Sequence, residues 1–288
     1  VTAQMKAVRA GAPCDLIFQS IAGSQKGNEA FGFNAATLQE ALDSLYAQTY
    51  QDFEIILCDD GSKDDTYAVA LENQSLHSNI VLLRNEQNLG LNATLNKCLA
   101  AAKGEYIARM DGDDLCDPTR FEKQVKFLDE HSEYAIVSSP MLYFDENGVF
   151  GKGSTHEGKP SLNMFNIGSP FCHAPCMVRK EAYDKVDGYT IDRRLLRVED
   201  YELWVKMYAA GYKGYNLGEH LYSMRDDRNA VVRRNWKNRK NEIYAHWLAY
   251  KRLNLSLFCF IKFSAITLFK AFCPTFVYNY FHKKNLNR

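Results

Sequence analysis

The sequence predicts an α/β protein built on a doubly wound, mostly parallel β-sheet. From about residue 38, short apolar runs alternate with longer segments whose apolar residues recur every three or four positions. Turn and capping residues separate the two kinds of segment, and repeats of this length are typical of parallel sheets covered by helices. With 288 residues, 46% of them hydrophobic, the chain has enough material for one large domain with an appendage.

The individual elements follow from these patterns in chain order. The predicted strands are short and rich in apolar residues, and they cover residues 53–58, 79–84, 105–110 and 134–139. The predicted helices are amphipathic, and they cover residues 38–48, 63–74, 91–104 and 117–131. Ser62 or Asp64 is expected to cap the second helix, and Asp117 the fourth. After Pro140 the alternation gives way to short strands and isolated helices.

The N-terminal part departs from this regular pattern. The segment 24–30, "SQKGNEA", is polar and contains glycine, so it is a poor strand by propensity. An apolar run lies earlier, at residues 15–23. Either that run is the first strand and a polar insertion follows it, or the first strand is missing or altered. We therefore expect residues 1–230 to form the main domain, with 1–30 atypical, and residues 231–288 to form a helical C-terminal region.

The net charge of zero hides an asymmetry between these two regions. From Val231 onward the chain holds twelve Lys and Arg residues and one acid, Glu242, whereas the first 230 residues hold 23 basic and 34 acidic residues. The overall balance argues against a nucleic-acid-binding protein, while a basic tail favours an anionic partner. Residues 253–284 are also rich in Phe, Leu and Ile, but Lys262 and Lys270 interrupt every run of spanning length. Helices lying in the interface of an anionic membrane fit this pattern, and a helical lid packed on the main domain is the alternative.

The eight cysteines are scattered and include no CxxC pair. This distribution predicts reduced, mostly buried thiols in a cytoplasmic protein. No N-terminal stretch has the charged-then-apolar layout of a signal peptide. Together with the basic tail, these features predict a cytoplasmic protein that is peripheral on the inner face of the cell membrane.

Acidic residues follow two of the predicted strands directly. Asp59 and Asp60 follow the strand 53–58, and Asp111, Asp113 and Asp114 follow the strand 105–110. In open α/β sheets, ligands bind beyond the carboxyl ends of the strands. Adjacent carboxylates repel one another, and Mg²⁺ or Mn²⁺ bound together with substrate phosphates would relieve that repulsion. For the first turn, a solvated loop that caps the next helix is the alternative.

Several motifs now carry a resemblance to a known family. The stretches "ALDSLYAQTYQDFEIILCDDGSKDDT" and "NLGLNATLNKCLAAAKGEYIARMDGDD", and the later "VEDYELW", resemble glycosyltransferase family 2 of bacterial polysaccharide biosynthesis. The similarity extends from about Asn34 to Ser223. It implies a GT-A fold and a metal-dependent, inverting transfer of a sugar from a nucleotide donor, expected to be UDP-linked, to a glycan or lipid-linked saccharide. The QxxRW motif of the processive members is absent from the sequence, which favours transfer of one sugar per event.

The resemblance also implies roles for particular residues on the donor side. Asn34 would lie at the edge of the nucleotide pocket, and Asp59 and Asp60 would contact uracil and ribose. Asp113 would bind Mn²⁺ or Mg²⁺, and Asp111 would contact the metal or the ribose. Asp114 would support both, and Arg109 would pair with the diphosphate or neutralise the acids.

Other matched positions fall on the acceptor side. In Glu199–Asp200 the aspartate would act as the general base, although an acid at a helix N-terminus is also favoured by the helix dipole alone. His173, Arg179 and Trp204 would lie near the acceptor, and a satisfied structural histidine is the alternative for His173. Two other functions stay open at this point. One is a sugar nucleotidyltransferase, and the other is a degenerate protein that only binds nucleotide sugars or membranes.

Overall fold

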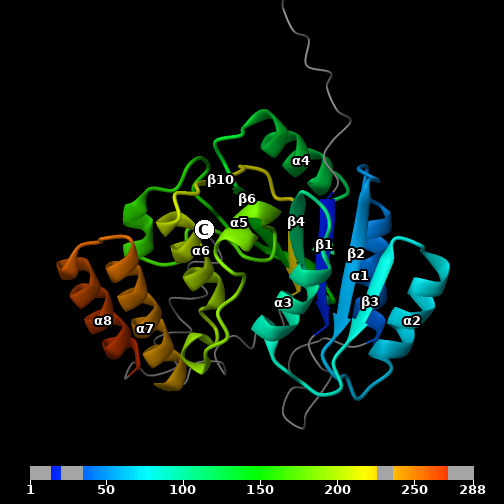
Figure 1. Cartoon of the computed structure of the whole chain (residues 1–288), viewed down its shortest axis with the longest axis horizontal. Helices are drawn as coiled ribbons and strands as arrows, with labels where there is room; N and C mark the ends of the chain where they lie inside the picture. The colour runs from blue at the N-terminus through cyan, green and yellow to red at the C-terminus, as the bar shows by residue number, and fades with distance from the viewer. Residues whose placement is uncertain (1–13, 21–34, 226–235, 272–288) are drawn as a thin grey trace, which may run out of the picture.

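The computed structural model describes residues 14–20, 35–225 and 236–271, and Figure 1 shows their arrangement. A seven-stranded sheet forms the centre, with the strand order β10-β6-β9-β4-β1-β2-β3. Its strands, in chain order, are β1 (Cys14–Ser20), β2 (Phe53–Asp59), β3 (Ile80–Arg84), β4 (Tyr106–Asp111), β6 (Ile136–Ser138), β9 (Met177–Arg179) and β10 (Gly214–Asn216). Within this sheet β9 runs antiparallel to its neighbours β4 and β6, and the other pairs are parallel. The predicted mostly parallel sheet is confirmed.

Helices cover both faces of this sheet, so the fold is doubly wound as predicted. Alternate residues of β2 enter two separate cores. Ile55 and Leu57 pack with residues of α1, α2 and α4, whereas Ile56 and Cys58 pack with residues of α3, α5, α6 and α7. These helices are α1 (Ala35–Tyr46), α2 (Thr66–Leu76), α3 (Leu91–Ala101), α4 (Arg120–Glu130), α5 (Lys180–Lys185), α6 (Glu199–Ala209) and α7 (Trp236–Arg252).

The four predicted helices and four predicted strands are all present, with ends shifted by up to three residues. At the starts of α2 and α4, the shifts come from the capping residues. Asp64 accepts a hydrogen bond from the backbone N–H of Thr66, and Asp117 accepts one from the N–H of Thr119, so each helix begins later than predicted. These side chains form tight turns ahead of the helices instead of sitting at the N-cap.

The first strand is the apolar run near the N-terminus. β1 lies between β2 and β4, and it pairs in parallel with both. This confirms the first of the two alternatives drawn from the sequence, in which the polar segment 24–30 follows the strand. That segment and Asn34 lie outside the described residues.

A second, four-stranded sheet lies beyond β4, with the order β5-β11-β7-β8. Its strands are β5 (Leu115–Cys116), β7 (Met141–Asp145), β8 (Gly148–Lys152) and β11 (Tyr222–Arg225). Because β5 comes directly after the acidic turn and pairs with β11, this small sheet brings residues 222–225 to the end of β4.

The C-terminal region is helical, as predicted, over its described part. α7 packs on α6 through Ala245 and Ala249, which are fully buried, and α8 (Leu257–Ala271) packs on α7. Both helices lie at the left of Figure 1, beyond α6. None of the helices in the described ranges combines the length and apolar character needed to cross a bilayer. The rest of the predicted tail, residues 272–288, lies outside these ranges.

Six of the cysteines are free thiols, as the sequence predicts. Four of them are buried, namely Cys58, Cys98, Cys116 and Cys176, and Cys172 and Cys259 are half-buried.

Candidate active site

The two acidic turns lie at the same edge of the central sheet. In the strand register, Asp59 is opposite Ser20 of β1, and Asp111 is opposite the neighbouring Gln19. Only one strand separates the two turns, so their backbones are about 10 Å apart. The predicted grouping of these acids at the carboxyl ends of the strands is therefore present.

The turn after β2 is tied into the fold by its own carboxylates. Asp60 is 1% exposed, and it accepts hydrogen bonds from Asn85 Nδ2 (2.8 Å), the N–H of Leu89 (2.8 Å) and the N–H of Gly90 (3.0 Å). These bonds hold the loop that leads into α3, where Gly90 has φ of 86°, a conformation that favours glycine. Asp60 thus organises the loop between β3 and α3.

Asp59, the last residue of β2, is also buried. Its Oδ1 accepts a hydrogen bond from the N–H of Ser62 at 3.1 Å. Its Oδ2 lies 3.3 Å from Nε of Arg84, whose side chain is half exposed. One of its oxygens therefore faces an arginine at the edge of the site.

The turn after β4 concentrates negative charge around buried partners. Asp114 is buried and accepts hydrogen bonds from the hydroxyl of Tyr222 (2.8 Å) and the N–H of Arg225 (2.7 Å). Burial raises the pKa of the Asp114 carboxyl well above its usual value, and the neighbouring charges of Asp113 and Asp111 raise it further. Asp111 and Asp113 are only partly buried, so their carboxylates lie closer to the solvent.

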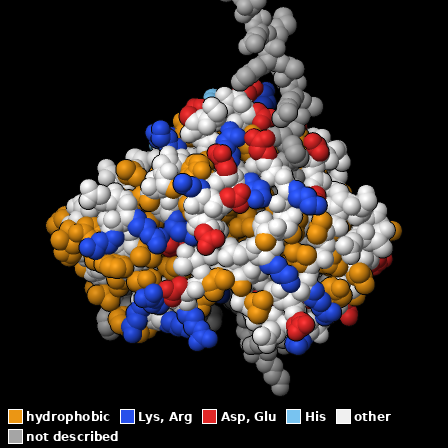
Figure 2. Space-filling view, viewed as in Figure 1, with side chains coloured by type: hydrophobic (Ala, Val, Ile, Leu, Met, Phe, Trp, Pro, Cys, Tyr) orange, Lys and Arg blue, Asp and Glu red, His pale blue; other side chains and the backbone are white. Residues whose placement is uncertain are grey.

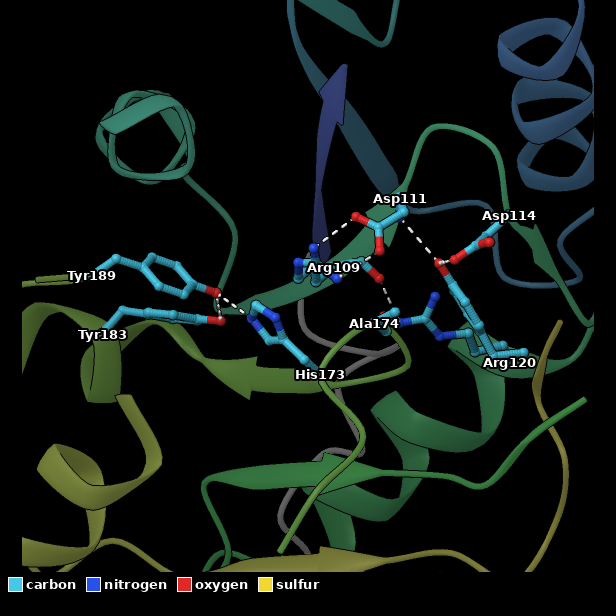
Figure 3. Close-up of polar contacts among 9 residues, drawn as sticks. Arg109, Asp111, Asp114, Arg120, His173, Ala174, Tyr183 and Tyr189 are labelled. Carbon is cyan, nitrogen blue, oxygen red and sulfur yellow. Dashed lines mark hydrogen bonds and ion pairs between the residues drawn. The ribbon is translucent and has the colours of Figure 1, made fainter. Parts of the chain in front are cut away.

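Arg109 compensates this charge from within the strand. Its guanidinium forms a two-pronged ion pair with Asp111, with N–O distances of 2.6 and 3.1 Å, as Figure 3 shows. Arg109 is 7% exposed, and its buried Nε has no hydrogen-bond partner among the described residues. Burial lowers the pKa of this guanidinium, but the charge and hydrogen bonds of Asp111, together with Tyr189 and Tyr222, raise it by more, so Arg109 stays charged. Its position leaves one buried donor free for a further acceptor.

The ED motif, Glu199–Asp200, forms the first turn of α6, and the positive charge of Arg109 acts on both of its carboxylates. Burial raises the pKa of the Asp200 carboxyl, and the nearby charge of Arg109 partly opposes that shift. Burial also raises the pKa of Glu199, with a further contribution from the charge of Asp200. We call Arg109, Asp111, Glu199 and Asp200 the Arg109 cluster. A carboxylate with a raised pKa is suited to accept a proton near neutral pH.

His173 is held among aromatic side chains. Its Nε2 lies 2.8 Å from the hydroxyl of Tyr189, which lies 3.4 Å from the hydroxyl of Tyr183, and Figure 3 shows these three side chains together. Trp204, which is fully buried, packs edge-on against the His173 ring at 5.8 Å between centroids. Burial and the charge of Arg109 lower the pKa of His173 well below its usual value, so the imidazole is neutral. Trp204 therefore packs against the His173 ring and has no exposed surface for an acceptor.

The structure does not bring Arg179 to this site. Arg179 is opposite Tyr106, the first residue of β4, whereas the acidic turn follows the last residue of that strand. Its guanidinium donates to the backbone oxygens of Leu128 (2.6 Å) and Tyr134 (3.0 Å). Arg179 thus connects α4 to β9, in place of the acceptor contact expected from the sequence. Arg120 is likewise structural, because it is fully buried and donates to the backbone oxygen of Arg109 at 2.8 Å.

Two residues of the site were missed by sequence reasoning. The hydroxyl of Tyr222 accepts a hydrogen bond from the N–H of Asp111 and donates to Asp114. Arg225 donates from its N–H to Asp114 and from Nε to the backbone oxygen of Asp113 at 2.9 Å. Both belong to β11, more than a hundred positions further along the chain, and no motif in the sequence marks them.

The donor set of the second turn fits a hard divalent cation. The described residues contain no group of three or more His, Cys, Asp or Glu side chains arranged to hold a metal by themselves. Mg²⁺ and Mn²⁺, however, are commonly held by one or two carboxylates together with substrate phosphates and water. Asp111 and Asp113 offer such a partial set at the solvent-facing side of the turn.

Comparison with known proteins identifies the family. The family model for glycosyl transferase family 2 matches residues 28–187. The putative glycosyltransferase EpsE of Bacillus subtilis is 42% identical over 87% of this chain and 90% of its own length. The chain belongs to glycosyltransferase family 2. This family 2 protein is therefore a glycosyltransferase, which excludes the alternative of a sugar nucleotidyltransferase.

Two further comparisons bear on this family 2 glycosyltransferase. An Escherichia coli enzyme described as UDP-Gal:alpha-D-GlcNAc-diphosphoundecaprenol beta-1,3-galactosyltransferase is 30% identical over 87% of the chain and 91% of its own length. The mannosyltransferase PcManGT of Pyrobaculum calidifontis, solved with GDP-Man and Mn²⁺, is similar with a TM-score of 0.60 at 15% identity, over 94% of this chain and 84% of that one. The structural likeness supports the predicted GT-A fold.

The N-terminal segment also falls under a second, short match. A second family model, that of the ethanolamine ammonia lyase large subunit (EutB), matches residues 1–54 and overlaps the first match from residue 28. Residues 1–27 are matched by this second model alone.

Proposed function

We propose that this glycosyltransferase transfers one sugar per event, with inversion, from a UDP-linked donor to a lipid-linked saccharide. The observation that carries the proposal is the Arg109 cluster. Asp111 of the turn after β4 pairs directly with Arg109, and the charge of Arg109 also lowers the pKa values of Glu199 and Asp200 at the start of α6. A nucleotide diphosphate at the first group and an acceptor hydroxyl at the second would meet beside Arg109.

Asp113 and Asp111 would hold Mn²⁺ or Mg²⁺ together with the donor diphosphate. When bound, the cation neutralises the diphosphate and so makes it a better leaving group. In the structure Asp111 pairs with Arg109, and its side chain is 29% exposed. Because it is not fully buried, the carboxylate could turn towards a metal ion at the solvent-facing side of the turn. The unpartnered Nε of Arg109 could then donate to the donor phosphate or sugar. Asp59 and Asn34 would complete the nucleotide pocket, while Asp60 would hold its wall in place.

Asp200 would act as the general base. It would take the proton of the acceptor hydroxyl as that oxygen bonds to the anomeric carbon, while the bond from this carbon to the diphosphate breaks on the opposite face. Its raised pKa strengthens it as a base, because burial disfavours its charged form. Glu199 and His173 would bound the acceptor side, with His173 neutral and fixed by Tyr189.

The name of the Escherichia coli relative supports the proposed donor and acceptor, because it pairs a UDP-sugar with a sugar linked to diphosphoundecaprenol. An acceptor of this kind would support a reaction at the inner face of the cell membrane. We infer that residues 1–230 form the catalytic part and that residues 231–288 contribute the membrane-facing part.

The test is a screen of nucleotide sugars against a diphosphoundecaprenol-linked acceptor, read by released nucleotide and by NMR of the product. The proposal predicts release of UDP, one added sugar, and an anomeric configuration opposite to that of the donor. Retention of configuration, or release of nucleotide without a glycosylated product, would contradict it.

A further inference from the structure

The outer face of α8 is apolar and uncovered. Among the described residues, sixteen large apolar side chains are exposed, and half of them lie on α7 and α8, which concentrates them at one end of the molecule. On α8, these are Leu257, Phe258, Ile261, Ile266, Leu268 and Phe269, with Phe258 74% and Phe269 75% exposed. Figure 2 shows hydrophobic side chains gathered at the left, over the helices labelled there in Figure 1.

The inner face of α8 already has its partners. Phe263 stacks on His246 of α7 with 3.4 Å between ring centroids, and Thr267 is 2% exposed. The exposed residues therefore lie on the side turned away from the domain. The alternative drawn from the sequence, a helical lid packed on the main domain, would bury these side chains. It therefore explains the contacts of the inner face of α8 but not the exposed outer face.

Basic residues lie within and beside this apolar face. α8 contains no acidic residue in its sequence LFCFIKFSAITLFKA, and its Lys262 is exposed between Phe258 and Ile266. The adjoining end of α7 carries Lys251 and Arg252, both in its last turn. Figure 2 shows Lys and Arg side chains beside the apolar area. This combination is complementary to a bilayer with anionic head groups.

A second copy of the chain would fit this face less well. The fully buried part of a protein interface is depleted of charged residues, and Lys in particular is rare there. Lys262 lies in the middle of the apolar face, where a lipid interface allows its ammonium group to reach the head groups.

The same helix is connected to the catalytic helix by side-chain contacts. The ring of His246 stacks on Phe263 on one side and on Tyr201 of α6 on the other, at 4.6 Å between centroids. Tyr201 is the residue after Asp200. Arg252 at the end of α7 forms an ion pair with Glu202, whose side chain is 1% exposed. Burial lowers the pKa of His246 to about 4, so this ring remains neutral within the stack.

We propose that the outer face of α8 docks on an anionic lipid bilayer and thereby holds α6, with Asp200, at a fixed orientation to the membrane surface. The orienting part rests on the proposed function, because it assigns the docked helix to the presentation of a lipid-linked acceptor. The docking part stands on the exposed apolar face and its basic surroundings, and it is measured without any catalytic readout.

The experiment measures binding of the full chain to phosphatidylcholine vesicles with and without phosphatidylglycerol, by cosedimentation. The double variant Phe258→Ser/Phe269→Ser is compared with Leu76→Ser, which removes a similarly exposed side chain (71%) at the end of α2. We expect the wild type and Leu76→Ser to bind anionic vesicles alike. The double variant should bind tenfold or more weakly, roughly the effect of withdrawing two aromatic rings from the interface. Added salt should weaken wild-type binding, since the attraction is partly electrostatic.

Two results would overturn the docking proposal. One is equal vesicle binding by the double variant and the wild type. The other is a wild-type dimer in analytical ultracentrifugation that the double variant makes monomeric while vesicle binding stays unchanged, which would assign the face to a second copy. If docking holds but transfer is absent even in detergent with a lipid-linked acceptor, the proposed function fails and the docking surface stands.

Discussion

The turn after β2 and the Arg109 cluster both place buried or half-buried acids at one edge of the sheet, yet their surroundings differ. Asp60 accepts three hydrogen bonds from its own chain, so its charge is matched locally. In the Arg109 cluster, Asp111 alone pairs directly with the guanidinium, and burial raises the pKa values of Glu199 and Asp200 although the charge of Arg109 opposes the rise. The first arrangement stabilises the fold. In the second, binding of a metal ion or a proton would lower the free energy of the carboxylates. Position at a strand end alone therefore does not identify a reactive acid.

The largest expected effect concerns Asp200. Asp200→Asn should lower the transfer rate by about 100-fold or more, because it removes the general base. Burial raises the pKa of Asp200 in the folded state, so its charged form destabilises the fold above that pKa, and this cost is relieved as the pH falls through it. Asn carries no charge, so the free energy of unfolding at neutral pH should stay equal or rise. Transfer assays and urea unfolding measure the two effects.

Asp192→Asn is the matched control for this change. Asp192 lies near the start of α6 but pairs with Arg194 at the surface. This variant should transfer sugar at the wild-type rate. If Asp200→Asn also did so, Asp200 would not be the base.

The next prediction concerns the turn after β2, where we expect a loss of stability and not of a catalytic group. Asp60→Ala should leave three donors without their acceptor and lower the free energy of unfolding by about 3 kcal/mol, at roughly 1 kcal/mol for each bond. Urea unfolding measures the loss. Asp65→Ala is the control, since the side chain of Asp65 makes no capping hydrogen bond to α2. Equal free energies of unfolding of the two variants would contradict a structural role for Asp60.

A smaller effect is expected at the support of the acidic turn. Tyr222→Phe removes a hydroxyl that donates to Asp114 and accepts from the N–H of Asp111. The free energy of unfolding should fall by about 1–2 kcal/mol, because both partners are buried or half-buried. The pKa of Asp114 should also rise further, since this hydrogen bond now lowers it. Denaturant unfolding at two pH values tests both statements.

The smallest expected effect is a shift in the pH profile of kcat/KM. Because burial raises the pKa of Asp200 above its ordinary value of 3.8, the acid limb of kcat/KM should lie at a higher pH than that value. Below the limb the base is protonated and the rate falls. The limb should be absent from the residual activity of Asp200→Asn. A limb that persists unchanged in this variant would belong to another group.

The sequence predicts much of this arrangement, because strand and helix periods are local. The runs around Ile56 and Ile107, and the acids that follow them, can be placed at one sheet edge from topology alone. Arg179 shows where local reasoning ends. Its motif matches, but β9 runs antiparallel to β4 and carries Arg179 to the opposite edge. The direction of a three-residue strand depends on tertiary contacts that its own sequence does not specify.

Tyr222 and Arg225 illustrate the same limit from the other side. They reach the acidic turn only because β5 and β11 pair in the small sheet. β5 is two residues long, and its pairing depends on contacts far apart in the sequence. Neither residue type carries a signal of its role at that distance.

Calorimetry of UDP binding tests the central claim most directly, namely that the acids after β4 bind a nucleotide diphosphate through a divalent cation. The account predicts Mn²⁺-dependent binding that EDTA abolishes. Asp113→Asn should weaken it roughly tenfold or more, and Asp200→Asn should leave it near the wild-type value. UDP binding of equal strength in EDTA, or unaffected by Asp113→Asn, would contradict the account.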